Sequence, residues 1–198
     1  MRTAFRAVCR RSLHLGAMLS LALFVEAPLA RGSETGSEPG SSPPAAWRHR
    51  VRTGALAAAA LERTLAGAAR RLGQPGCLDV YRSFDEVPDF QPDARLQALG
   101  LTLAQYLAVI VFADGADRPL CRRGDVLAVT APGSRVVYVC SARFAEAASR
   151  DPEGTEALLI HEALHSLGLP ENPPASREIT RRVLACCGDA AVAATRPR

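Results

Sequence analysis

The sequence predicts an α+β fold in which several helices pack with a small mixed or antiparallel sheet. Two runs rich in β-branched residues flank a turn within 125–140, and helix-like patterns occupy 47–72, 155–167 and 176–187. The chain of 198 residues is long enough for one domain with a core, but hardly for two. We therefore expect one domain over 47–190.

The N-terminus has the pattern of an export signal. Four arginines precede an apolar run at 13–25, and small residues then offer cleavage after Ala27 or Ala30. The apolar run is too short for a membrane-spanning helix. We predict a signal peptide over 1–30, an exported (periplasmic or secreted) protein, and no stable membrane span after the signal is removed.

The charge of the remaining chain is close to neutral. Residues 1–30 hold four of the 24 basic residues, all arginines, and one of the 20 acids, so 20 arginines and 19 acids remain. Nucleic-acid binding therefore has no electrostatic motive. The Gly, Ser and Pro run at 31–46 predicts a disordered linker, and 191–198 a disordered tail.

The first half of the domain mixes helices with ambiguous segments. The Ala- and Leu-rich run 47–72 predicts a long helix ended by the GQPG turn at 73–76. Residues 77–84 resemble a short strand, and 93–100 a short helix closed by Gly100. The segment 100–115 favours a helix at its start and a buried strand at its end.

The run 125–140 predicts a β-hairpin with a loop at 131–134. In such a hairpin the residues near 125 lie opposite those near 140, so Cys121 can reach Cys140. An exported chain can keep this disulfide. Cys77 is then left to meet Cys186 or Cys187. A short helix is expected at 142–150.

The segment HEALH lies in the predicted helix 155–167, which Gly168 would end. Residues four apart share one helix face, so His161 and His165 can present both imidazoles to one metal ion. Their apolar neighbours occupy the other side, which predicts one buried face and one face toward a cleft. Glu162 lies beside the first histidine, where it can act as general base toward water activated by Zn²⁺.

A zinc site of this kind needs a third protein ligand. The chain has four histidines, of which His14 belongs to the signal and His49 to the start of the domain. Two acids follow the helix. Glu171 comes six residues after His165, and Glu178 thirteen residues after it, in the first turn of the predicted helix 176–187. Both are candidates, and we lean slightly to Glu178.

HEALHSLGLPE resembles the zincin-type zinc metallopeptidases and, in part, the longer metzincin pattern H-E-x-x-H-x-x-G-x-x-H/D. Glu171 stands at the last position of that pattern. The resemblance implies hydrolysis of a peptide or protein substrate. It also implies a zincin-like fold with a mixed sheet, whose edge strand lies above the active-site helix and pairs with extended substrate. By position, 135–140 would be that strand.

Two strand residues, Tyr138 and Arg135, are candidates for stabilising the oxyanion of the tetrahedral intermediate. Two other hypotheses compete with the peptidase. One is a zincin-like zinc-binding or interaction module without proteolytic activity, and the other is a small disulfide-stapled helical domain with an accidental motif. The presence of Glu162 favours the enzyme, because a structural zinc site has no need of a general base.

Overall fold

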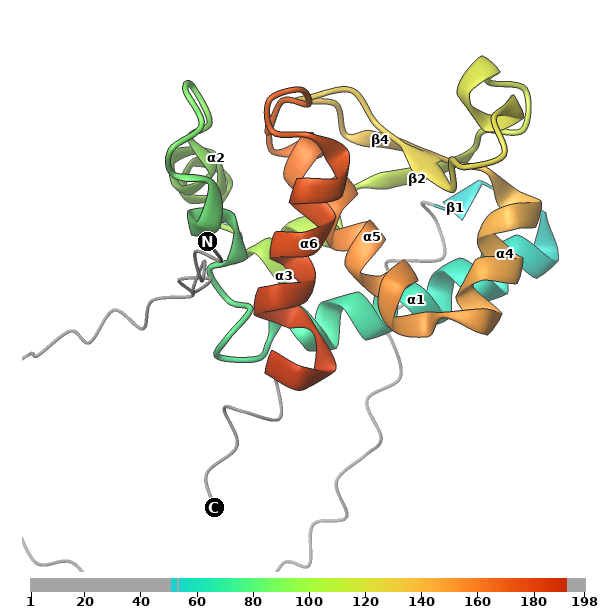
Figure 1. Cartoon of the computed structure of the whole chain (residues 1–198), viewed down its shortest axis with the longest axis horizontal. Coiled ribbons are helices and arrows are strands. Elements are labelled where there is room, and N and C mark those ends of the chain that lie inside the picture. Colours follow the sequence, from blue (N-terminus) through green and yellow to red (C-terminus); the bar gives the residue numbers. More distant parts are fainter. Residues whose placement is uncertain (1–50, 53, 192–198) are drawn as a thin grey trace, which may run out of the picture.

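Four short strands form one mixed sheet at the top of the molecule in Figure 1, and helices fill the space below it. The structure is a computed structural model that describes residues 51–52 and 54–191. The sheet order is β1-β2-β4-β3, with strands β1 (Val51–Arg52), β2 (Val111–Asp114), β3 (Ala128–Val129) and β4 (Val136–Val139). β1, β2 and β4 run parallel, and β3 pairs antiparallel with β4, with Val129 opposite Tyr138.

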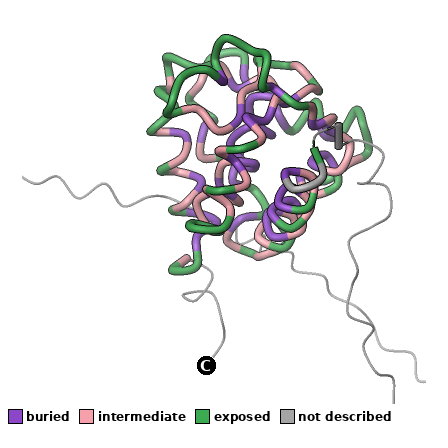
Figure 2. Tube along the Cα trace, turned by 90° about the vertical axis from the view of Figure 1, so that its right-hand side faces the viewer, coloured by how far each residue is buried: buried purple, intermediate pink, exposed green. Residues whose placement is uncertain are grey.

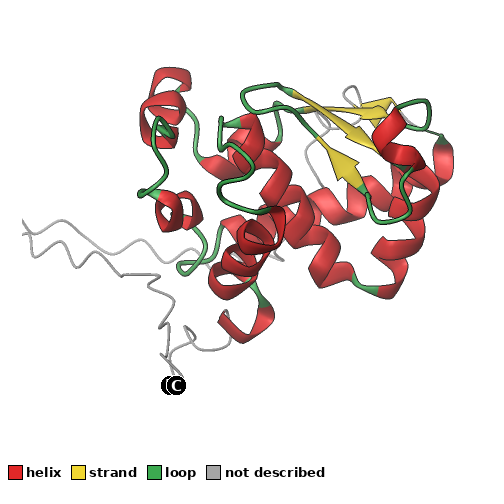
Figure 3. Cartoon of the chain, turned by 45° about the horizontal axis from the view of Figure 1, so that its top comes forward, coloured by secondary structure: helices red, strands yellow, loops and turns green. Residues whose placement is uncertain are grey.

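The helices surround one central member, α5. It contacts α1, α4 and α6 along its sides and the strands β3 and β4 above (Figures 1 and 3). The α-helices are α1 (Ala55–Leu72), α2 (Pro92–Leu99), α3 (Leu103–Leu107), α4 (Ser141–Arg150), α5 (Pro152–Ser166) and α6 (Ser176–Cys187), and the 3₁₀ helices are η2 (Val80–Phe84) and η3 (Pro119–Arg122).

The buried residues form one cluster that extends from Leu61 on α1 to Cys187 on α6. Figure 2 shows the buried positions gathered along the middle of the trace, with exposed ones around it. Val137 and Val139 bring the inner face of the sheet into this cluster, and Leu159, Ile160 and Leu164 bring α5. The α+β class is therefore confirmed.

Several local predictions are confirmed. The helix closed by Gly100 is α2, and Gly100 adopts the left-handed conformation, with φ 64°. The helices expected at 142–150 and 176–187 are α4 and α6. The ambiguous segment 100–115 contains both elements, since α3 is followed by β2. The hairpin is present as β3 and β4, with shorter strands than expected.

One element prediction is wrong, and two predicted helices begin at other residues than expected. Residues 77–84 form turns and η2 instead of a strand, because their buried residues Val80, Tyr81 and Phe84 follow a helical spacing. The first helix begins at Ala55, since β1 lies before it. The helix of the HEALH motif begins at Pro152 rather than Thr155, because the Asp151 side chain caps it by accepting a hydrogen bond from the Gly154 N–H at 2.9 Å.

Two disulfides are present among the described residues. Cys121 is bonded to Cys140, as the hairpin geometry predicts. Cys77 is bonded to Cys187, one of the two partners that the sequence left open. The predicted signal, the linker and nearly all of the predicted tail lie outside the described residues. No helix in the described part is long and apolar enough to cross a bilayer.

Candidate metal centre

His161 and His165 lie one turn apart on α5 and turn their rings toward each other. The two Nε2 atoms are 2.9 Å apart, and the ring centroids are separated by 4.7 Å. Both side chains are almost fully buried, with exposed fractions of 2% and 3%. The i, i+4 spacing therefore brings the two imidazole nitrogens to one point, as the sequence predicts.

The other ring nitrogen of each histidine also has a partner. His165 Nδ1 lies 2.7 Å from the carbonyl oxygen of Leu169, in the turn that follows α5. His161 Nδ1 lies 2.9 Å from the hydroxyl oxygen of Thr180, which comes from α6. Partners of this kind fix the ring orientation of metal-binding histidines.

These contacts fit a pair of metal ligands. A carbonyl oxygen only accepts hydrogen bonds, so His165 Nδ1 carries a proton, and the neutral form of the ring then presents a lone pair at Nε2. Two nitrogens bound to one tetrahedral zinc ion are about 3.3 Å apart, given bonds of about 2.0–2.1 Å. The observed 2.9 Å is within a few tenths of an ångström of that separation. Burial, helped by the neighbouring His165, lowers the pKa of His161 to about 3, so its ring is neutral, as a ligand must be.

Glu162 lies within the core, with 4% of its surface exposed. Its carboxyl group accepts a hydrogen bond from the backbone N–H of Thr130, and its Oε2 atom has no hydrogen-bond partner. Burial is the main cause that raises the pKa of Glu162 to about 8, and the charge of Glu171 adds to it. A buried carboxyl oxygen without a partner is costly, and a polar ligand or cation beside it would offset that cost.

The two candidates for a third ligand differ in their surroundings. The Glu178 carboxylate accepts hydrogen bonds from Arg181 and Arg182, which hold its pKa below the usual range. Glu171 is exposed, in the loop that turns at Gly168, and its charge acts on Glu162. Within the described residues, no group of three His, Cys, Asp or Glu side chains is arranged to hold a metal ion.

The sequence predicts that one face of the HEALH helix is turned toward a cleft, but no exposed face is found on this part of the helix. α5 is buried on every side from Leu159 to Leu167. The turn between β3 and β4 covers it, because the Gly133 N–H donates to the His165 carbonyl oxygen at 2.8 Å. The Thr130 N–H, at the start of the same turn, donates to Glu162.

The segment 135–140 is not an edge strand, so the expectation that it forms the edge of the sheet above the active-site helix is wrong. β4 pairs with β2 on one side and with β3 on the other. The long-range parallel pairing with β2 places β4 inside the sheet, and the short β3 forms the edge next to it.

The two oxyanion candidates differ in their surroundings. Tyr138 alternates with Val137 and Val139, which are fully buried on the inner face of the sheet. Side chains alternate along a strand, so Tyr138 points to the outer face, where the Arg118 guanidinium stacks 3.9 Å from its ring centroid. Arg135 is exposed at the start of β4.

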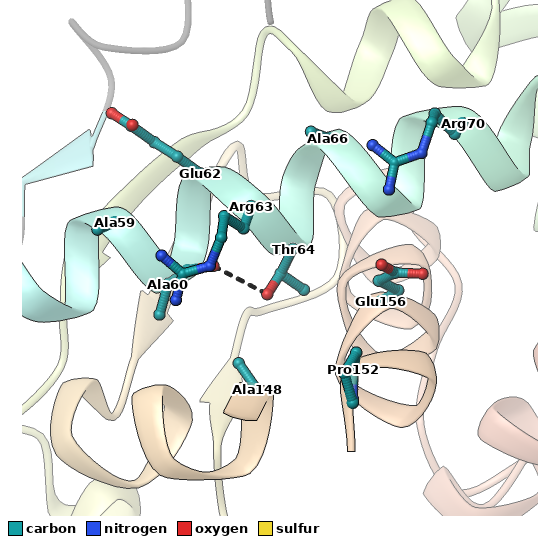
Figure 4. Close-up of a pocket in the computed structure, with 10 residues that line it drawn as sticks. All are labelled: Ala59, Ala60, Glu62, Arg63, Thr64, Ala66, Arg70, Ala148, Pro152 and Glu156. Atoms are coloured by element: carbon teal, nitrogen blue, oxygen red, sulfur yellow. Dashed lines mark hydrogen bonds between the residues drawn. The ribbon is translucent and has the colours of Figure 1, made fainter. Parts of the chain in front are cut away.

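A groove of about 580 Å³ runs along α1, on another part of the molecule. Figure 4 shows it between α1 and the α4–α5 connection, with the Glu156 side chain entering from α5. Its lining residues are Ala59, Ala60, Glu62, Arg63, Thr64, Ala66, Arg70, Ala148, Pro152 and Glu156. The HEALH residues do not line it, so it plays no part in the candidate centre.

Three contributors to the centre were not predicted from the sequence: the Thr130 N–H, the Leu169 carbonyl and the Thr180 hydroxyl. Backbone groups carry no residue-type signal. Thr180 does carry one, since it stands with Val183 and Cys187 at positions i, i+3 and i+7, where an apolar residue is expected on a buried face. A hydroxyl in that stripe indicates a polar partner.

Comparison of the chain with protein-family models, with curated proteins and with solved structures finds no match in any of the three.

Proposed function

We propose that the protein is an exported zinc-dependent peptidase of the zincin type. The observation that carries the proposal is the pair of histidine Nε2 atoms 2.9 Å apart, on two rings whose Nδ1 atoms are each held by a hydrogen bond. The adjacent residue, Glu162, adds a buried carboxyl oxygen that has no hydrogen-bond partner. Two imidazoles supply two of the three protein ligands of a catalytic zinc ion, and a neighbouring carboxylate supplies the general base of metal-assisted hydrolysis.

Each group of the centre has a distinct role in this proposal. His161 and His165 would hold zinc through Nε2, and zinc would supply the Lewis acidity that makes water a nucleophile near neutral pH. Glu162, oriented by the Thr130 N–H, accepts a proton from the attacking water and delivers it to the leaving amine. The unpartnered Oε2 is the atom available for that proton.

Glu171 is the better candidate for the third ligand. It follows the turn at Gly168, whose φ of 100° directs the chain back across the end of α5, and its charge already acts on Glu162. Glu178 would have to leave two arginines, and one of these, Arg182, also bonds Glu86 and the Ser83 carbonyl. The slight preference for Glu178 from the sequence is therefore reversed here.

The edge strand β3 is the place where an extended peptide would pair. The Cys140 N–H donates to the Leu127 carbonyl oxygen at 2.9 Å, so main-chain groups at Ala128 and Thr130 face the open edge by antiparallel alternation. The Thr130 N–H at this edge reaches Glu162. A peptide added beside β3 would therefore lie next to the proposed catalytic group.

The burial of the centre favours a second candidate, a zincin-like zinc-binding or interaction module that does not cleave peptides. His161, Glu162 and His165 are all closed off by the β3–β4 turn. A catalytic site would require that turn to move so that substrate can enter, whereas a structural zinc site would not require any movement. The buried Glu162 carboxyl favours the peptidase. A structural zinc site would have no use for a carboxyl group that does not bind the metal, whereas catalysis needs a general base.

Export is supported by the disulfides. Bonds such as Cys77–Cys187 and Cys121–Cys140 persist in oxidising compartments and are rare in reducing ones. The predicted signal at 1–30 is consistent with this. N-terminal sequencing of exported protein tests the point: a start after Ala27 or Ala30 is expected, and a start at Met1 would contradict it.

Zinc content and proteolysis together test the function. We expect purified mature protein to contain one zinc ion, to cleave an unfolded protein substrate, and to lose that activity with a chelator and regain it with added zinc. His161→Ala and His165→Ala should each lose the metal. Zinc without cleavage would favour the binding module, and absence of zinc would leave an accidental motif.

A further inference from the structure

The two histidines of the centre are held by different kinds of group. His165 is bonded to a main-chain carbonyl in the turn after its own helix, at Leu169. His161 is bonded to a side chain of another helix, Thr180 of α6, nineteen positions along the chain. The second contact can be removed by a single substitution, so its contribution can be measured.

Thr180 uses its hydroxyl differently from other threonines in the helices. A helical threonine ordinarily donates to the carbonyl oxygen three or four residues before it. Thr64 does so toward Ala60 at 3.0 Å, and Thr155 toward Asp151 at 2.9 Å. The Thr180 hydroxyl instead forms a hydrogen bond with the His161 ring.

The protons on the two rings follow from these partners. His165 Nδ1 must donate to the Leu169 carbonyl, so His165 Nε2 is an acceptor when both rings are neutral, as zinc ligands are. In metal-free protein, His161 Nε2 therefore carries the proton that bridges the 2.9 Å between the rings, and His161 Nδ1 accepts a hydrogen bond from Thr180. When both Nε2 atoms bind a metal ion, the proton of His161 must reside on Nδ1, which then donates to the Thr180 oxygen.

We propose that Thr180 is a positioning residue that serves both proton arrangements of His161 and thereby raises the affinity of the centre for zinc. A hydroxyl can donate in one state and accept in the other, which neither a carbonyl nor an amide N–H can do. This inference rests on the proposed zinc site. It does not depend on whether the protein cleaves peptides.

The position of Thr180 is fixed by its helix. Ile179 and Val183 are fully buried on α6, and Cys187 at its C-terminal end is bonded to Cys77. Arg182 bonds the Ser83 carbonyl and Glu86, which ties α6 to the segment around η2. The β-branched side chain of threonine adds rotamer restriction at the hydroxyl itself.

Three variants of the full mature chain test the proposal with zinc as the probe. Thr180→Val removes the hydroxyl and keeps the shape, Thr180→Ser keeps the hydroxyl, and Thr64→Val removes a buried hydroxyl from α1 as a matched control. Competition with a chelator measures zinc affinity, and circular dichroism checks folding. Thr180→Val should lower the affinity roughly 10- to 100-fold, the range known for removed partners of metal-binding histidines. Thr180→Ser and Thr64→Val should stay close to the parent.

NMR of the imidazole nitrogens gives a second readout that a merely structural role would not move. We expect His161 to carry its proton on Nε2 in the metal-free parent and on Nδ1 in the zinc-bound parent, with His165 on Nδ1 in both. Thr180→Val binding zinc as tightly as the parent would overturn the role of Thr180 while leaving the zinc site intact. A parent without zinc affinity would overturn both.

Discussion

The Glu162 carboxyl combines burial with an oxygen that has no partner. Replacing it by glutamine keeps the size of the side chain and an oxygen that can accept from the Thr130 N–H, but the amide cannot take up a proton. Glu162→Gln should therefore retain zinc and lose hydrolytic activity by about 10²–10⁴-fold, the usual contribution of a general base. Zinc content and cleavage rate of the same preparation decide the point, and an unchanged rate would refute the assignment.

Alanine substitutions separate the two candidates for the third ligand. Glu171→Ala should lower zinc affinity, because it removes the carboxylate that is proposed to complete the centre and whose charge already acts on Glu162. Glu178→Ala should leave the affinity close to the parent value, because its carboxylate is engaged by Arg181 and Arg182. Chelator competition measures both. If the affinity fell with Glu178→Ala alone, Glu178 would be the ligand and Arg181 would have to release it.

The residues that define the centre divide into those the sequence predicts and those it does not. The convergence of His161 and His165 follows from helix geometry alone, since any helix over the motif brings positions i and i+4 together. The contacts of Thr130, Leu169 and Thr180 depend on how the sheet, the following turn and α6 pack around α5. Thr180 leaves a local pattern, as a hydroxyl in an apolar stripe of α6, but the main-chain groups of Thr130 and Leu169 leave none.

At the level of elements, the same distinction separates confirmed predictions from wrong ones. Gly100 ends α2 because a left-handed residue is needed there, and the composition of 125–140 suffices for a hairpin. β4 was expected at the edge of the sheet, but β2, which pairs with it, lies more than 20 positions earlier in the chain. Local composition carries no information on that parallel partner.

The turn that follows α5 is a second element open to test. Gly168 has φ 100°, and an added Cβ atom would lie 2.6 Å from the Arg95 guanidinium. Gly168→Ala should destabilise the fold by about 1–2 kcal/mol, the cost of a left-handed residue with a side chain. It should also weaken zinc binding, because the Leu169 carbonyl that orients His165 comes next in the chain.

Gly124→Ala is the matched control for Gly168, since a Cβ atom there meets nothing within 4 Å. Urea unfolding of the two variants should show a lower midpoint for Gly168→Ala and a midpoint near that of the parent for Gly124→Ala. Equal midpoints would show that the turn tolerates a side chain.

At the scale of the whole molecule, long-range links join the two ends of the core around α5. Arg71 on α1 bonds Glu156 on α5 at 2.5 Å and the Cys187 carbonyl at the end of α6 at 2.9 Å. The Cys77–Cys187 disulfide joins the same region covalently. α6, which carries Thr180, is therefore held against α1 and α5 by contacts distant in sequence, so the geometry of the centre depends on the complete fold.

The two disulfides should contribute unequally to stability. Their sequence separations are 110 residues for Cys77–Cys187 and 19 for Cys121–Cys140. By the entropy of loop closure, removing the first should cost about 5 kcal/mol and removing the second about 3 kcal/mol. Urea unfolding of the paired alanine variants measures the difference. The first pair should also lower zinc affinity, because α6 loses its covalent link to Cys77 and Thr180 is held less firmly. The second pair fastens the loop before β3. Equal losses of stability, or zinc affinity reduced only by the second pair, would show that the Cys77–Cys187 bond is not what holds α6 in place.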